Sequence, residues 1–361
     1  MILNPQLAEQ ARTKLQVIID SGKKKAENSL KSIIEEYDVR KDFLAPATTI
    51  NYQDISRQQV GIKDKEFHLT NYSLSQLLSK VGMPKTFFTT LQNKQTSWAN
   101  DLIKANLESL TINGAMKGKK LLFRTIDDLA KGILSDSYRR MDARPIFDTF
   151  INQGLKRGLV PMDGLNTTTQ YHVKMVLPEI YEPIEGEVIA FGFCMTTSDY
   201  GAAALQMQSF IMRIHCTNLA IGEDIVRKVH LGRRINDNDL TFSQQTYDLD
   251  TKTIASMVGD FLSENAIQEQ LDSTLKAITN SSEREIDIEA TLKSLREKGI
   301  ITKDGEKTAK MLYDTDAIEL LPSQKGAWKF SNVLGLMANK KDIDGDISLK
   351  LQEAAYSVIN Q

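Results

Sequence analysis

The sequence predicts an α+β protein with a central antiparallel β-meander, flanking helices, and helical N-terminal and C-terminal segments. Two observations predict this class. Apolar residues recur at helical spacing near both ends of the chain, whereas residues 171–177 alternate between apolar and polar side chains, which is typical of a half-buried strand. With 361 residues, of which 41% are hydrophobic, the chain is long enough for about two domains and a full hydrophobic core.

Residues 1–116 are expected to form a mainly helical N-terminal region. Leu7, Ala11 and Leu15 repeat at helical spacing, so we expect an amphipathic helix over the first 36 residues. Gly22 is a candidate interruption of this helix. Residues 42–70 then change to strand and turn character.

Two short helices are predicted next. Ser73 and Gln76 form a capping box, Gly82 ends the first helix, and Pro84 opens the second. Another helix is expected over residues 96–110. The first two helices resemble a helix-turn-helix. The second carries side chains able to reach bases or phosphates, namely Lys85, Thr86, Thr89, Gln92 and Lys94.

Residues 117–245 are expected to form a β-rich basic core. A helix is expected over residues 143–158, and the predicted strands are residues 119–125, 130–135, 171–177, 187–195 and 203–216. Alternation along the last strand places Leu205, Met207, Ile211, Arg213 and His215 on one face, and Phe210, Met212, Ile214 and Cys216 on the other. Arg213 then either borders a cleft or pairs with a buried acid such as Asp199 or Asp136.

Residues 246–361 are expected to form a helical C-terminal region. The predicted helices are residues 251–278, 286–298, 306–313, 326–338 and 346–359, and Asn280–Ser282 reads as a helix break. The sequence shows neither a signal peptide nor an apolar stretch long enough to span a membrane. We therefore expect a cytoplasmic protein that does not contact membranes.

Motifs for metal, nucleotide and nucleophilic chemistry are missing from the sequence. The four histidines and two cysteines lack zinc-ligand spacing, and no P-loop, GxGxxG or GxSxG motif occurs. Asp342, Asp344 and Asp346 resemble the start of a calcium loop, but Ile347 stands where that loop needs glycine. We expect no cofactor, no metal site and no catalytic residues.

Basic residues concentrate in the β-rich core. Residues 117–157 contain ten Lys and Arg against five Asp, although the whole chain has a net charge of −2. A second basic group lies at residues 227–234. Basic residues neutralise phosphates, and aromatic residues stack on the bases of single strands. The predicted nucleic-acid-binding residues are Lys119, Lys120, Arg124, Tyr138, Arg139, Arg140, Arg213, Arg227, Arg233 and Arg234.

Several segments resemble a protein family that occurs on bacterial phages and plasmids. Residues 134–142 (LSDSYRRMD) resemble its "LSDxYRxxD" element, and residues 197–201 (TSDYG) its "NSDxG" element, with Thr197 in place of asparagine. Residues 210–218 (FIMRIHCTN) resemble its "FxxRxxCTNG" element, although Leu219 replaces the final glycine. His230–Gly232, Gln76–Pro84 and residues 326–332 also fit the family.

The resemblance implies a protein made in the cytoplasm of a bacterium that carries a phage or plasmid. Together with the basic core, it leads to one main hypothesis and two alternatives. The main hypothesis is a homo-oligomeric protein that binds single-stranded DNA in replication or recombination, without ATPase activity. One alternative is an interaction protein that recruits or inhibits a host enzyme. The other is a metal-dependent nucleic-acid enzyme built on Asp136, Asp142, Asp199, Arg213, His215 and His230.

Overall fold

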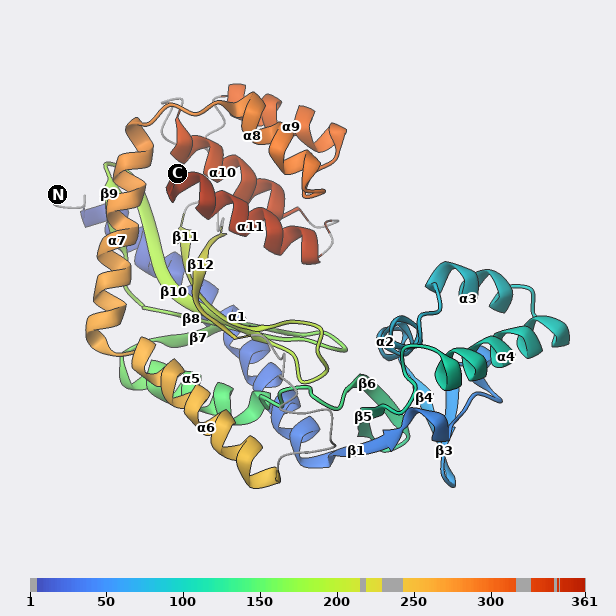
Figure 1. Ribbon diagram of the computed structural model, residues 1–361. Helices are drawn as coiled ribbons and strands as arrows, with labels where there is room; N and C mark the ends of the chain where they lie inside the picture. Colours follow the sequence, from blue (N-terminus) through green and yellow to red (C-terminus); the bar gives the residue numbers. More distant parts are fainter. Residues whose placement is uncertain are drawn as a thin grey trace.

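The computed structural model describes residues 5–214, 219–228, 243–315, 326–340, 343 and 345–360. It confirms the α+β class, with two sheets and helices at both ends of the chain (Figure 1). The first helix, α1 (Pro5–Val39), is continuous through Gly22. A side chain at that position would collide with the main-chain oxygen of Met162, so this glycine lets α1 pack closely against a strand.

The first sheet has the order β1-β5-β6-β4-β3-β2. Its strands are β1 (Arg40–Pro46), β2 (Ile50–Asn51), β3 (Gln59–Ile62), β4 (Lys65–Leu69), β5 (Lys120–Ile126) and β6 (Leu129–Ser135). Short 3₁₀ helices η1 (Ala47–Thr49) and η2 (Ile55–Arg57) join the early strands. The expected boundary at residues 116–117 therefore lies inside one sheet, because β5 and β6 pair with strands from the N-terminal region.

Three helices cover this first sheet. They are α2 (Asn71–Val81), α3 (Lys85–Gln92) and α4 (Ser97–Asn113), and they share a hydrophobic core with the sheet. We call the first sheet and these helices the first lobe, which lies at the right of Figure 1. Helix α2 ends at Gly82 in the left-handed conformation, as predicted.

The start of α2 differs from the predicted start at Ser73. The N-cap is Thr70, whose hydroxyl accepts a hydrogen bond from the main-chain N–H of Ser73 at 3.0 Å. Gln76 does not complete a capping box. Its side chain reaches outward, donating to the Tyr200 carbonyl at 2.9 Å and accepting from the Ile133 N–H at 2.8 Å.

The second sheet is the predicted antiparallel meander. Its order is β12-β11-β10-β8-β7, and β9 pairs with β10. The strands are β7 (Val160–Asn166), β8 (Tyr171–Val176), β9 (Tyr181–Ile184), β10 (Glu187–Thr197), β11 (Leu205–Arg213) and β12 (Leu219–Lys228).

Helices cover both faces of the second sheet. α1 packs on one face, over Phe210, Met212 and their neighbours. The opposite face, which includes Met207 and Ile211, packs against α5 (Ala143–Lys156), α6 (Gln244–Phe261) and the later helices. This confirms the two faces predicted for residues 205–214. Burial on both sides also explains why every residue of β10 is buried.

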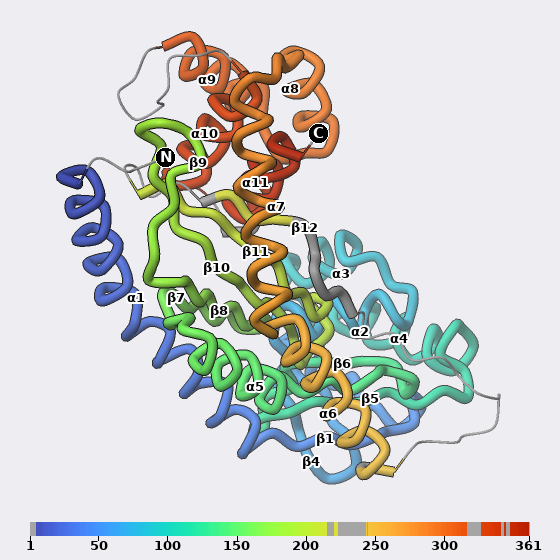
Figure 2. The backbone as a smooth tube through the Cα atoms, turned by 90° about the vertical axis from the view of Figure 1, so that its left-hand side faces the viewer, coloured from blue at the N-terminus to red at the C-terminus, as the bar shows by residue number. Residues whose placement is uncertain are grey.

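The C-terminal helices gather at one end of the second sheet. They are α7 (Glu264–Glu283), α8 (Ile288–Glu297), α9 (Lys303–Asp314), α10 (Ala327–Ala338) and α11 (Gly345–Asn360). Figure 2 shows α7 running along the sheet to this group. The expected break at Asn280–Ser282 is wrong, because Ser281 and Ser282 bond back to carbonyls of α7 and the helix continues to Glu283.

Candidate functional site

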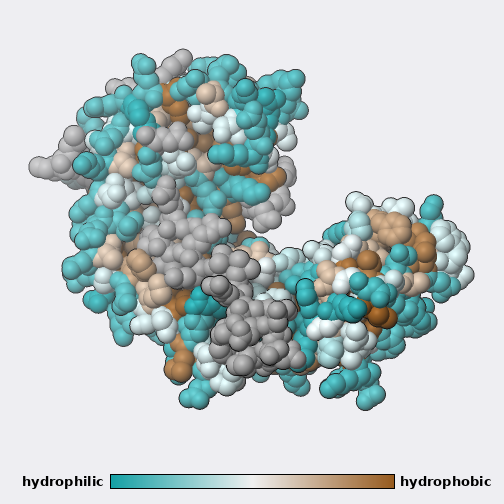
Figure 3. Space-filling model, in the orientation of Figure 1, coloured by the Kyte–Doolittle hydropathy of each residue, from teal (hydrophilic) through white to brown (hydrophobic). Residues whose placement is uncertain are grey.

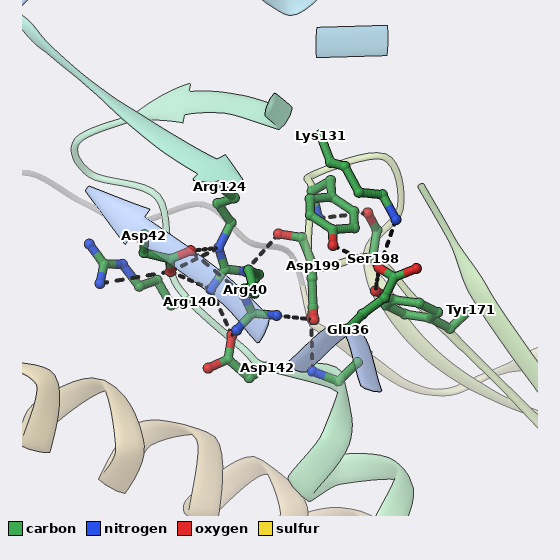
Figure 4. Close-up of polar contacts among 12 residues, drawn as sticks. Glu36, Arg40, Asp42, Arg124, Lys131, Arg140, Asp142, Tyr171, Ser198 and Asp199 are labelled. Atoms are coloured by element: carbon green, nitrogen blue, oxygen red, sulfur yellow. Dashed lines mark hydrogen bonds and ion pairs between the residues drawn. The ribbon is translucent and has the colours of Figure 1, made fainter. Parts of the chain in front are cut away.

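Three sequence segments converge where the first lobe meets the second sheet. Arg124 lies on β5, Asp142 caps α5, and Asp199 lies in the turn between β10 and β11. Arg40 and Asp42 join them from β1 (Figure 4). We call this group, together with Arg140, the arginine–aspartate junction.

Hydrogen bonds connect the aspartates of the junction to Arg124 and Arg40. Arg124 donates to both carboxylate oxygens of Asp42 at 2.8–3.1 Å, to Asp142 Oδ1 at 2.7 Å, and to the Asp199 carbonyl at 2.6 Å. Arg40 donates to Asp142 Oδ1 at 2.6 Å and to Asp199 Oδ2. Asp199 Oδ1 accepts from the Ala143 N–H at 2.8 Å, at the start of α5.

Charges at the junction balance, because three arginines face three aspartates. Burial by itself would raise the pKa of Asp142, but the attraction of Arg124 and Arg40 outweighs it and holds the pKa below its ordinary value. For Asp199, burial raises the pKa more than Arg40 lowers it, and the nearby charge of Asp142 adds to the rise. Burial also raises the pKa of Tyr138, so its phenol stays protonated.

A second polar group adjoins the junction. Glu36, near the end of α1, accepts three hydrogen bonds at one carboxylate oxygen. The donors are Lys131 Nζ at 2.7 Å and the hydroxyls of Tyr171 and Tyr200, each at 2.8 Å. Because Lys131 lies on β6 and Tyr171 on β8, this carboxylate ties the two sheets together.

The arrangement positions the two sheets relative to each other. Buried charges need partners for every polar atom, and the carboxylates at the junction have arginines or main-chain N–H groups as partners. Within the described residues, no group of three His, Cys, Asp or Glu side chains could hold a metal ion. The metal-dependent alternative also named His215 and His230, which lie outside the described residues.

Three of the predicted nucleic-acid-binding residues are buried, which corrects the expectation that they contact phosphates or bases from the surface. Arg124 is 0% exposed and Tyr138 is also buried. Arg213 Nε donates to Glu187 Oε1 at 2.5 Å, and Trp328 Nε1 donates to the other oxygen of Glu187 at 3.1 Å. Arg213 thus pairs with a buried acid, but the acid is not one of the two expected partners.

Two further arginines have partners near the surface. Arg139 Nε donates to Asp250 Oδ2 on α6 at 2.6 Å. The Arg140 guanidinium lies over the ring of Tyr247, 4.7 Å from its centroid. These contacts attach α6 to the segment before α5, so both arginines have structural roles.

The remaining predicted residues fall into three groups. Lys119 is exposed and Lys120 is half-buried at the start of β5. Arg227 lies on β12, opposite Gln206 in the strand register, but its side chain is outside the described part. Arg233 and Arg234 lie outside the described residues altogether.

Exposed aromatic side chains occur elsewhere, on the first lobe. Of the described aromatic residues, only Phe87 on α3 and Trp98 on α4 are exposed, by 42% and 55%. Lys85 lies on α3 and Lys94 in the turn between α3 and α4, and both are exposed. Hydrophobic residues gather over these helices in Figure 3. Residues 71–120 contain seven Lys against two acids. We call Lys85, Phe87, Lys94 and Trp98 the α3–α4 surface.

The sequence contained a signal for this surface. Ala99, Ile103 and Leu107 form the buried stripe of α4, and Trp98 lies outside that stripe. The helix-turn-helix interpretation had already named Lys85 and Lys94. Trp98 was not predicted, because it lies outside the arginine-rich core, where aromatic residues lie next to basic residues.

Two further findings concern membrane-spanning helices and similarity to known proteins. Among the described helices, none combines the length and apolar character needed to cross a membrane. Comparisons of the chain with protein-family models, with curated proteins and with solved structures found no match.

Proposed function

We propose that this protein binds single-stranded DNA through the α3–α4 surface. The observation that carries the proposal is that the only exposed aromatics of the described residues, Phe87 and Trp98, lie within the lysine-rich stretch 71–120. Aromatic rings stack on unpaired bases, and lysines neutralise the phosphates between them. Bases inside a duplex are already stacked, so the surface favours a single strand.

A role in replication or recombination rests on the resemblance to the family found on phages and plasmids. Proteins on mobile elements meet single strands when their DNA is copied or exchanged. The sequence lacks a phosphate-binding loop, which is consistent with binding that needs no ATP. The lysines would contact any sequence alike, so little sequence preference is expected.

The two tryptophans of the chain provide a direct test. Trp98 is exposed, whereas Trp328, on α10, is buried. Titrating a short oligothymidine into the protein at low salt should quench the fluorescence of Trp98 through stacking, while Trp328 keeps its emission. The variant Trp98→Phe should bind normally but show no quenching.

Removing the exposed ring of Trp98 allows a comparison with a matched control variant. Trp98→Ala should weaken binding by about 1–3 kcal/mol, the usual contribution of one stacked base. Met311→Ala is the control, because Met311 on α9 is also apolar and is 63% exposed. Equal affinity of Trp98→Ala and Met311→Ala, or no binding at low salt, would overturn the proposal.

A second candidate function is recognition of a protein partner by the same helices. Leu102 follows Trp98 by one helical turn and is 40% exposed. Exposed tryptophans next to aliphatic side chains are common centres of protein interfaces. A purified host protein that binds after nuclease treatment, and loses affinity in both Trp98→Ala and Leu102→Ala, would favour this candidate.

A further inference from the structure

A groove of about 430 Å³ lies between α8 and α11. This volume is within the range of sites for small molecules. Its lining combines apolar and polar groups. Leu295 and Val358 are buried apolar residues of the lining, whereas Ser294 and Ser357 contribute hydroxyl groups.

The charged side chains of the groove favour an anion. Lys298, which follows α8, and Lys350, on α11, both line the groove, and neither has a carboxylate partner among the described residues. Their presence contrasts with the region around them, because residues 246–361 carry 20 Asp and Glu against 14 Lys and Arg. Glu353 also lines the groove, and its Oε1 accepts a hydrogen bond from Gln208 Nε2 at 3.2 Å.

We propose that the α8–α11 groove binds a small amphipathic anion, with a carboxylate, sulfonate or phosphate group on an apolar body. The two ammonium groups and the serine hydroxyls are donors suited to the anionic group. The side chains of Leu295 and Val358 give the apolar body a surface to contact. This site is on the C-terminal helices and is independent of the α3–α4 surface.

The probe for the test is anilinonaphthalene sulfonate, which combines a sulfonate with aromatic rings and becomes fluorescent in apolar surroundings. The full chain carrying Trp98→Ala is used throughout, so that the exposed ring on α4 contributes no binding. Octanoate and octylammonium then compete for the probe. Octanoate should displace it, whereas octylammonium, with the same apolar chain and the opposite charge, should not.

Charge-removing variants locate the site. Lys298→Gln with Lys350→Gln should weaken probe binding about tenfold or more, because two charged hydrogen-bond donors are lost. Lys293→Gln with Lys303→Gln is the matched control, since these exposed lysines belong to α8 and α9 but do not line the groove. Ser294→Phe, which fills the groove without changing charge, should also reduce binding. Equal binding by the groove and control variants, or equal competition by octylammonium, would overturn the proposal.

Discussion

The arginines of the junction and the lysines of the α3–α4 surface carry the same charge, but the fold gives them opposite surroundings. Arg124 is completely buried and donates to Asp42 and Asp142. Lys85 and Lys94 are exposed, and among the described residues the ammonium group of Lys85 donates to a serine hydroxyl, that of Ser75, at 2.8 Å. The guanidinium group suits the junction because its several fixed donors can satisfy several carboxylates at once.

This contrast shows why the number of basic residues in a segment does not identify a nucleic-acid interface. The acids that neutralise the junction come from distant parts of the chain: Asp42 is 82 residues from Arg124, and Asp199 is 159 residues from Arg40. The lysines of the α3–α4 surface differ from the arginines of the junction in being exposed and in having no carboxylate partner in the described part of the chain. A substitution that disturbs one region should therefore leave the other unaffected.

The largest effect is expected from Asp199→Asn. This change removes one of the carboxylates that bind the buried Arg40 guanidinium and leaves Asp142 as its hydrogen-bonded carboxylate, which should lower the free energy of unfolding by about 3–5 kcal/mol. Urea denaturation followed by circular dichroism measures the change. Asp101→Asn, at an exposed position of α4, is the control. A loss no larger than that of the control would mean that the junction does not hold the first lobe against the second sheet.

A smaller effect is expected from the pH dependence of His172. Burial, helped by the charge of Lys174, lowers the pKa of this histidine to about 3, whereas in the unfolded chain its pKa is about 6.5. As the pH falls below 6.5, only the unfolded state takes up the proton. Stability should therefore fall with decreasing pH, by at most about 1.4 kcal/mol per pH unit.

Urea midpoints measured between pH 6.5 and about 5, above the range in which most carboxylates titrate, test this expectation. His172→Gln should make stability nearly independent of pH in this window. His68→Gln should keep the pH dependence of the original protein, because His68 is an exposed residue of β4. If His172→Gln keeps the full slope, another group is responsible.

The smallest effect is expected at the start of α2. Thr70→Ala removes the hydroxyl that accepts a hydrogen bond from the Ser73 N–H, and should cost about 1 kcal/mol of stability. Thr96→Ala is the comparison, because Thr96 precedes α4 but makes no side-chain capping bond there. Thermal unfolding of both variants distinguishes them. A larger loss in Thr96→Ala would contradict the assignment of the cap.

Local patterns predicted much of the fold. Alternation along residues 205–214 identified both faces of β11, because those faces pack against different layers of helices. The end of α2 at Gly82 was also predictable from its local chemistry. The helix break predicted at Asn280–Ser282 was wrong, because serine side chains can bond to the preceding turn of a helix as readily as they can end it.

Little of the candidate site was predictable. A guanidinium that contacts phosphate and one that holds two sheets together have the same sequence signature, and only the positions of Asp42 and Asp199 distinguish them. Arg213 was predicted only in part: a buried acid was one of the two surroundings left open for it, but it was also counted among the nucleic-acid-binding residues. The partner itself, Glu187, became evident only from the pairing of β10 with β11.

One measurement tests the central claim, that the α3–α4 surface binds the phosphates and that Arg139 and Arg140 do not. The affinity for oligothymidine is measured across a salt series for Lys85→Gln with Lys94→Gln, and for Arg139→Gln with Arg140→Gln. The lysine variant should bind more weakly and show a shallower dependence on salt, because it releases fewer counterions. The folded arginine variant should keep the original slope. A reduced slope in the arginine variant, with an unchanged slope in the lysine variant, would contradict the account.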